Sequence, residues 1–140
     1  MTNSNDIAAL LLRLTLAALF LAHAWLKIFV FTPAGTSGFF ESLGLPGIVA
    51  YLTIFAEVIG AIALIIGLQT RWVSLALTPI LIGSIVFVHG ANGWLFSAPN
   101  GGWEFPAFWA VALIVQALLG AGAYRMDITN GKLQYVGGVA

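Results

Sequence analysis

Four long apolar runs constrain what this chain can fold into more than any other feature of its sequence. They cover residues 7–31, 48–68, 72–89 and 106–124, in a chain of 140 residues that is 61% hydrophobic and only 7% charged. Each run is close to the roughly 20 residues needed to cross ~30 Å of hydrocarbon. Backbone groups inside a bilayer must be bonded within their own segment, which favours α-helices. The sequence therefore predicts an all-α protein, a transmembrane up-and-down four-helix bundle in contact with the lipid bilayer.

The bundle is expected to form one domain over residues 1–126, followed by a polar, loosely ordered C-terminal tail over residues 127–140. The first helix should end before Thr32-Pro33, because a residue that precedes proline disfavours helix. Residues 38–44 set two phenylalanines beside an acid, which is typical of a short segment lying at the membrane interface. Within the tail, Asn130-Gly131 predicts a turn.

The basic residues predict the orientation in the membrane. Four spans place both termini and the turn around Arg71 on one side, and that side also carries Arg13, Arg125 and Lys132. The opposite side has Lys27 alone. Because positive charge is enriched on the cytoplasmic side of membrane proteins, both termini are expected in the cytoplasm.

Charge and cysteine content exclude some classes of function. The formal net charge is zero, so the chain has no basic patch for nucleic acid, and no nucleic-acid partner is expected. Cysteine is absent. The chain therefore cannot carry out dithiol–disulfide exchange by itself.

Ionisable side chains at the outer ends of the four runs are the candidate site. At 1.5 Å per residue, Lys27 lies ~6 Å and His23 ~12 Å from the outer end of the first helix, and Glu57 lies ~13 Å into the second. His89 ends the third run and Glu104 precedes the fourth, both at the outer rim. An ionisable group facing lipid costs a few kcal/mol, so we expect all five to point into one cavity.

This constellation is compatible with three interpretations. In the first, Lys27 pairs with Glu104 or Glu57 and the histidines donate to carbonyls, so the charges are structural. In the second, imidazoles and carboxylates move protons for a bound, quinone-like molecule. In the third, two histidines and two glutamates bind zinc, iron or copper. The metal interpretation is the weakest, because the ligands are spread over four helices with no local Glu-x-x-His pair.

With these residues placed, the chain resembles the DoxX family of small bacterial four-helix membrane proteins over roughly residues 10–125. The matching stretches are Leu12-Arg13-Leu14, Phe20-Leu21-Ala22-His23-Ala24 with Lys27, residues 38–46, Glu57-Val58-Ile59-Gly60, residues 67–71, His89 with Asn92-Gly93, and residues 101–106. Ala24 stands where glycine is usual, and Trp103 where tyrosine is frequent. The resemblance implies a multi-pass protein of the bacterial cytoplasmic (inner) membrane, associated with membrane redox functions.

Carried over residue by residue, the resemblance implies a site made of Arg13, His23, Lys27, Glu57, His89 and Glu104. The function it favours is a membrane oxidoreductase component or accessory subunit that handles a quinone or another small redox-active molecule. In that interpretation the histidines transfer protons, the glutamates orient or neutralise them, and Lys27 holds an anionic oxygen, with Arg13 as a further cofactor-binding residue. On depth alone, however, Arg13 should stand apart, since it lies ~15 Å nearer the cytoplasm than His23.

Two alternatives stay open at this point. The chain could be a non-catalytic scaffold or assembly partner for a soluble redox enzyme, with charges that only fix helix register. It could also be a small transporter, although four short helices would need to form a homo-oligomer to enclose much of a path. Copurified quinone or metal would favour the redox interpretation.

Overall fold

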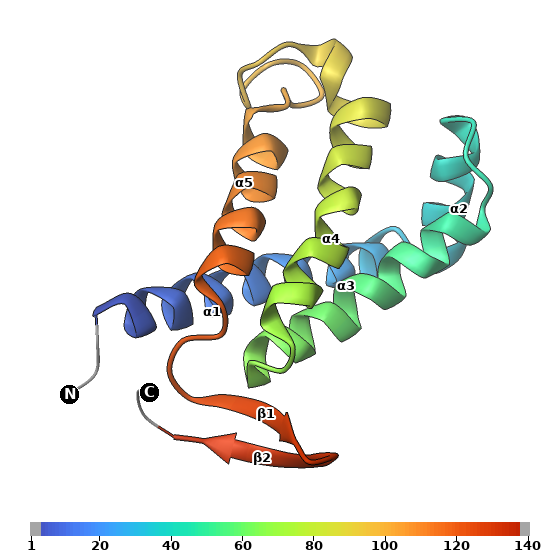
Figure 1. Ribbon diagram of the computed structural model, residues 1–140. Helices are drawn as coiled ribbons and strands as arrows, with labels where there is room; N and C mark the ends of the chain where they lie inside the picture. Colours follow the sequence, from blue (N-terminus) through green and yellow to red (C-terminus); the bar gives the residue numbers. More distant parts are fainter. Residues whose placement is uncertain (1–3, 138–140) are drawn as a thin grey trace.

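The computed structural model of the chain describes residues 4–137 and is mostly helical (Figure 1). The helical elements in chain order are α1 (Ser4–Trp25), the π-helical η1 (Leu26–Val30), α2 (Pro33–Ser42), α3 (Ile48–Ile66), α4 (Thr70–Ser84), the π-helical η2 (Ile85–His89), the 3-10 helix η3 (Gly90–Asn92) and α5 (Glu104–Leu119). Two strands follow, β1 (Arg125–Thr129) and β2 (Lys132–Val136). The expected helical class is confirmed, and the small sheet is an addition to it.

Three continuous helices within the described residues are long and apolar enough to cross a membrane. They span Ser4–Val30, Ile48–Ile66 and Thr70–Asn92, so α1 continues through η1, and α4 continues through η2 and η3. The fourth apolar run was expected to reach residue 124, but α5 has 16 residues and ends at Leu119. It ends there because Gly120 and Gly122 adopt positive φ angles of 82° and 68°, which do not continue a right-handed helix.

The four longest helices are arranged as two antiparallel pairs, α1 with α3 and α4 with α5 (Figure 1). The start of α1, the turn between α3 and α4, and the end of α5 lie toward the β-hairpin, and we call this the hairpin end. At the opposite end the two pairs diverge. There α2 follows η1 on one side, and the connection between η3 and α5 lies on the other.

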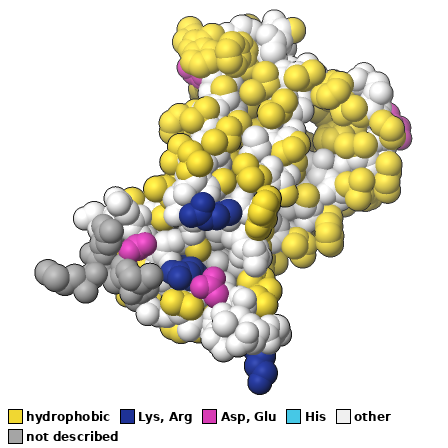
Figure 2. Space-filling model, in the orientation of Figure 1, with side chains coloured by type: hydrophobic (Ala, Val, Ile, Leu, Met, Phe, Trp, Pro, Cys, Tyr) yellow, Lys and Arg dark blue, Asp and Glu magenta, His cyan; other side chains and the backbone are white. Residues whose placement is uncertain are grey.

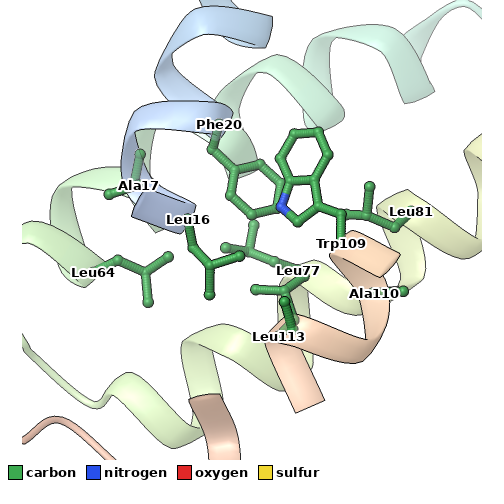
Figure 3. Close-up of a cluster of buried hydrophobic side chains, with 11 residues drawn as sticks. Leu16, Ala17, Phe20, Leu64, Leu77, Leu81, Trp109, Ala110 and Leu113 are labelled. Atoms are coloured by element: carbon green, nitrogen blue, oxygen red, sulfur yellow. The ribbon is translucent and has the colours of Figure 1, made fainter. Parts of the chain in front are cut away.

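A hydrophobic cluster holds the two pairs together where they cross. Figure 3 shows Leu16 and Phe20 of α1 meeting Leu77 of α4 and Trp109 of α5, with Leu64 of α3 beside them. The Phe20 and Trp109 rings lie 4.7 Å apart between centroids, a separation at which tilted aromatic pairs attract.

Glycine in α3 allows α4 to approach. A Cβ atom added at Gly60 would come within 2.8 Å of the Leu77 Cδ atoms, which is closer than packed side chains tolerate. Gly60 and Ala56 form a pair of small residues four positions apart, a spacing that lets a neighbouring helix approach closely. Gly67 has a different role, because it ends α3 with a positive φ of 73°.

The first long connection is a helix and not the short turn expected over residues 38–44. The preceding helix ends before Thr32-Pro33, as predicted, and Thr32 then caps α2 by accepting a hydrogen bond from the Gly35 N–H at 3.1 Å. Pro33 occupies the first helical position, where its missing N–H has no cost. Buried Thr36 donates to the carbonyls of Lys27 and Thr32 at 3.2 and 2.9 Å, which ties α2 to η1.

The C-terminal segment, expected to be loosely ordered, forms a β-hairpin. Strands β1 and β2 pair antiparallel from Arg125–Val136 to Thr129–Lys132. The predicted turn at Asn130-Gly131 is confirmed, with both residues at positive φ. The boundary expected between residues 126 and 127 falls inside β1, and residues 138–140 of the expected tail lie outside the described part of the chain.

Candidate functional site

A cavity of about 570 Å³ lies where the two helix pairs diverge. Its walls come from all five α-helices and from η1 and η2, and in Figure 2 the surface is hollowed between the part over α4 and the part over α2. His23, Lys27, Glu57 and His89 all line it. Four of the five side chains expected to share a cavity therefore do so, although they come from three different helices.

Lys27 and Glu57 form the electrostatic centre of the cavity. The Lys27 ammonium lies 2.8 Å from Oε1 and 3.0 Å from Oε2 of Glu57, so it donates to both carboxylate oxygens. The Glu57 side chain is only 3% exposed and that of Lys27 is 18% exposed. Charge-assisted hydrogen bonds of this kind are the strong ones, and a charge this deeply buried requires a partner.

His23 lies one helical turn before Lys27 and has no bonded partner. Its ring meets Trp109 edge-on, with centroids 5.0 Å apart. Within residues 4–137 neither ring nitrogen of His23 makes a hydrogen bond, whereas the ring itself is half-buried in the cavity wall. A neutral imidazole offers one donor and one acceptor, so both are available to a bound molecule or to water.

His89 lines the cavity from the end of η2 and is held by the loop that precedes α5. Its Nδ1 lies 2.9 Å from the Gly101 carbonyl oxygen. The same oxygen accepts a hydrogen bond from Asn92 Nδ2 at 3.0 Å, and that amide also donates to Val88 and Asn100. The π-helical geometry of η2 ends at His89, and π-helical turns occur frequently at functional sites.

The rest of the wall is largely aromatic. Seven aromatic side chains line the cavity: Phe20, Phe31, Phe39, Phe40, Phe87, Phe105 and Trp109. Two of them come from α2, which therefore forms one wall of the cavity and not only a connection. A mostly apolar wall with a few converging polar groups is the usual form of a small-molecule site.

Glu104 does not belong to this cavity, contrary to expectation. Its Oε1 accepts the Phe96 N–H at 2.6 Å, so it fixes the loop before α5. The side chain borders a separate, almost wholly apolar groove along α5 with Trp94, Phe105 and Phe108. The loop folds back over the start of α5 through several glycines, which turns Glu104 away from Lys27.

Arg13 does not line the cavity either, so its proposed cofactor-binding role has no support from its position. It is 1% exposed and lies at the hairpin end, as its depth predicted. Its guanidinium donates to the carbonyl oxygens of Ala121 at 2.9 Å, Ala123 at 3.4 Å and Tyr124 at 2.9 Å. Arg13 therefore holds the segment after α5 against α1.

Sequence reasoning missed Asn92 and Trp109 as site residues. Asn92 could have been identified, because it is followed by Gly93 and an Asn-Gly pair is typical of a turn. In such turns the asparagine side chain often forms hydrogen bonds with main-chain groups. Trp109 gave no signal, because an aromatic residue in an apolar run indicates only burial.

No group of three or more histidine, aspartate or glutamate side chains gathers closely enough among residues 4–137 to hold a metal ion. The four ligands of the metal interpretation are divided, since Glu104 lies elsewhere and Glu57 is engaged by Lys27. The polar groups that remain suit hydrogen bonding and proton transfer to an organic molecule.

A helical membrane protein with an ion pair and two imidazoles in an aromatic cavity is the class that the fold and site define. A model of the DoxX family matches residues 8–90, more than half of the chain. "Putative oxidoreductase CatD" of Bacillus subtilis (strain 168) is 34% identical over 135 residues, covering 94% of this chain and 95% of that protein. "Inner membrane protein YqjF" of Escherichia coli (strain K12) is 30% identical over 136 residues, covering 91% and 95%. The chain belongs to the DoxX family. No solved structure matches it significantly.

Proposed function

We propose that this chain is a multi-pass protein of the bacterial inner membrane, with α1, α3, α4 and α5 as the four spans and α2 at the outer interface. Both termini would face the cytoplasm. Three arginines support this orientation: Arg13 and Arg125 lie beside Gly67 at the end of α3, and Arg71 lies beside Gly120 at the end of α5. On the face drawn in Figure 2, the Lys and Arg side chains lie toward the hairpin end, and the remainder is mainly hydrophobic. This is the charge asymmetry expected of a cytoplasmic end.

We propose further that the protein is a component or accessory subunit of a membrane redox system, and that its cavity holds a quinone or another small redox-active ring. One observation carries this proposal: four ionisable side chains share an aromatic-lined cavity of about 570 Å³. That volume lies within the range of small-molecule sites, about 300–1,000 Å³. The name of the Bacillus subtilis relative, which calls it an oxidoreductase, is in agreement.

The cavity residues have distinct roles in this proposal. The Phe and Trp side chains hold a planar ring by apolar contact. His23 of α1 and His89 of η2 exchange protons with its oxygens as general acid–base groups. Glu57 neutralises and orients Lys27, whose ammonium directs two hydrogens at the carboxylate and retains a third for a ligand oxygen.

The test is the content of the cavity in gently solubilised protein. Mass spectrometry of organic extracts, together with metal analysis, should find a redox-active ring compound at near-stoichiometric amounts in the unaltered protein. Glu57→Gln should retain less of it, because Lys27 loses its partner. Glu41→Gln is the matched control, since Glu41 is exposed on α2. Equal retention by both variants would contradict the proposal, as would protein that carries no such compound and binds none when it is added.

A second function, a non-catalytic scaffold or assembly partner for a soluble redox enzyme, is favoured by the ion pair itself. Lys27 and Glu57 satisfy each other within the fold, and such a pair can serve only to fix the helices. The scaffold proposal expects a stable complex with a soluble enzyme, or a homo-oligomer that recruits one. Activity of that complex should survive His23→Phe and Glu57→Gln, whereas the redox-site proposal expects it to be lost.

A further inference from the structure

The orientation of His89 defines what its free nitrogen can bind. A carbonyl oxygen only accepts hydrogen bonds, so the 2.9 Å contact with Gly101 requires a proton on Nδ1 of His89. In the neutral ring Nε2 is then an acceptor. Gly101 itself is fixed, because its carbonyl also accepts from Asn92 and its N–H donates to the Ala98 carbonyl at 2.8 Å. Asn92 is therefore a positioning residue for this tautomer.

The loop before α5 engages one nitrogen of the His89 ring and leaves the other free. A Cβ atom added at Gly101 would lie 3.5 Å from both Nδ1 and Cε1 of His89, so this edge lies against the loop. Nε2 is the ring nitrogen that is not bonded to this loop, and His89 lines the cavity. Within residues 4–137 no side chain donates to Nε2, so it is an unpaired acceptor. Trp109 Nε1, buried in the same wall, is an unpaired donor.

We propose that the cavity binds the reduced, hydroxyl-bearing form of an aromatic ring, a hydroquinone-type diol, which donates a hydroxyl hydrogen to Nε2 of His89. This inference rests on the proposed ring-binding function and makes it specific. The oxygens of an oxidised quinone only accept, so one of them would meet the Nε2 lone pair without a bond. A hydroxyl supplies the missing donor, and its oxygen can still accept hydrogen bonds from other groups. The opposite oxygen of the ring would lie toward His23 and Lys27.

The experiment compares three rings of one shape in the unaltered protein. Durohydroquinone, duroquinone and 1,4-dimethoxytetramethylbenzene are dialysed to equilibrium, without oxygen, against nanodiscs that contain the protein. Empty nanodiscs correct for partition into lipid. We expect durohydroquinone to bind about tenfold tighter than either other ring, which is the effect of one hydrogen bond to a strong acceptor. His89→Phe keeps a planar ring and should reduce this preference to about one.

The outcomes separate the two proposals. If duroquinone or the dimethoxy ring binds as tightly as durohydroquinone, the cavity recognises ring shape alone and the diol inference is wrong, although the ring-binding function stands. If no ring binds above empty nanodiscs, both proposals are overturned. If His89→Phe still prefers durohydroquinone, the hydroxyl must donate to another acceptor, and the proposed role of Nε2 is wrong. Should that variant fail to fold, the comparison of ligands on the unaltered protein still decides the question.

Discussion

Separating Lys27 from Glu57 should cost much of the stability of this protein, and the loss can be assigned to the pair by a double-mutant cycle. Glu57→Gln keeps the side-chain shape but removes the charge that both ammonium hydrogen bonds, at 2.8 and 3.0 Å, depend on. Lys27→Met keeps most of the apolar stem and leaves a carboxylate that is 3% exposed without a cation. Breaking a buried pair usually costs about 3–5 kcal/mol.

The lower end of that range applies here, because the Lys27 side chain is 18% exposed and reaches some solvent. We expect each single variant to lose about 3 kcal/mol of unfolding free energy and the double variant about 4 kcal/mol. The difference between the summed single losses and the double loss is a coupling of about 2 kcal/mol. Most of the stability lost in each single variant would then come from the remaining charged residue, which is left buried without its partner.

Unfolding by dodecyl sulfate in mixed micelles, followed by the fluorescence of the five tryptophans, measures these free energies. Glu41→Gln, at an exposed carboxylate, should change stability by less than about 0.5 kcal/mol. A coupling below about 0.5 kcal/mol would refute the reasoning, since two residues that stabilise each other cannot have additive effects.

Three further predictions concern the hairpin end. Arg13→Met removes the donors to three carbonyls, so we expect a loss of about 3 kcal/mol and faster amide hydrogen exchange across residues 120–136 by mass spectrometry. Gly67→Ala should cost about 2 kcal/mol in the same micelle assay, because φ is 73° and the new methyl would collide with the Arg13 guanidinium, whereas Gly38→Ala, in open space, should be neutral or better. A reporter fused to the C-terminus should be active only if it is a cytoplasmic reporter, and activity of a periplasmic one would reverse the proposed orientation.

The helices and the shared cavity were predictable because the membrane imposes few choices. Length and apolarity identified α1, α3 and α4. The cost of placing charge in lipid predicted that His23, Lys27, Glu57 and His89 share a cavity. The expected depths in the membrane placed Glu57 level with His23, yet the partner of Glu57 is Lys27. A lysine stem carries the ammonium about one helical turn beyond its backbone, so side-chain length decided the pairing.

The predictions that were wrong concern segments whose path is set by backbone conformation. Glu104 follows a loop in which glycines with positive φ reverse the chain. Its carboxylate accepts a hydrogen bond from the Phe96 N–H of that loop and does not line the cavity. Positive φ angles at Gly120 and Gly122 ended α5 early. The turn at Asn130-Gly131 was visible, but the short, polar strands on either side gave no apolar alternation to identify them.

The cavity and the hydrophobic core share residues, and this affects how the site works. Phe20, Leu81 and Trp109 belong both to the buried cluster and to the cavity wall, so the floor of the site is the packed junction of all four long helices. Another wall comes from α2, which packs against α3 and is hydrogen-bonded to η1 through Thr36. In the proposed function, such a floor would hold a ring at one depth, near the ion pair and the two imidazoles. Because the floor belongs to the core, it cannot be displaced to admit a molecule without breaking the packing that joins the two helix pairs.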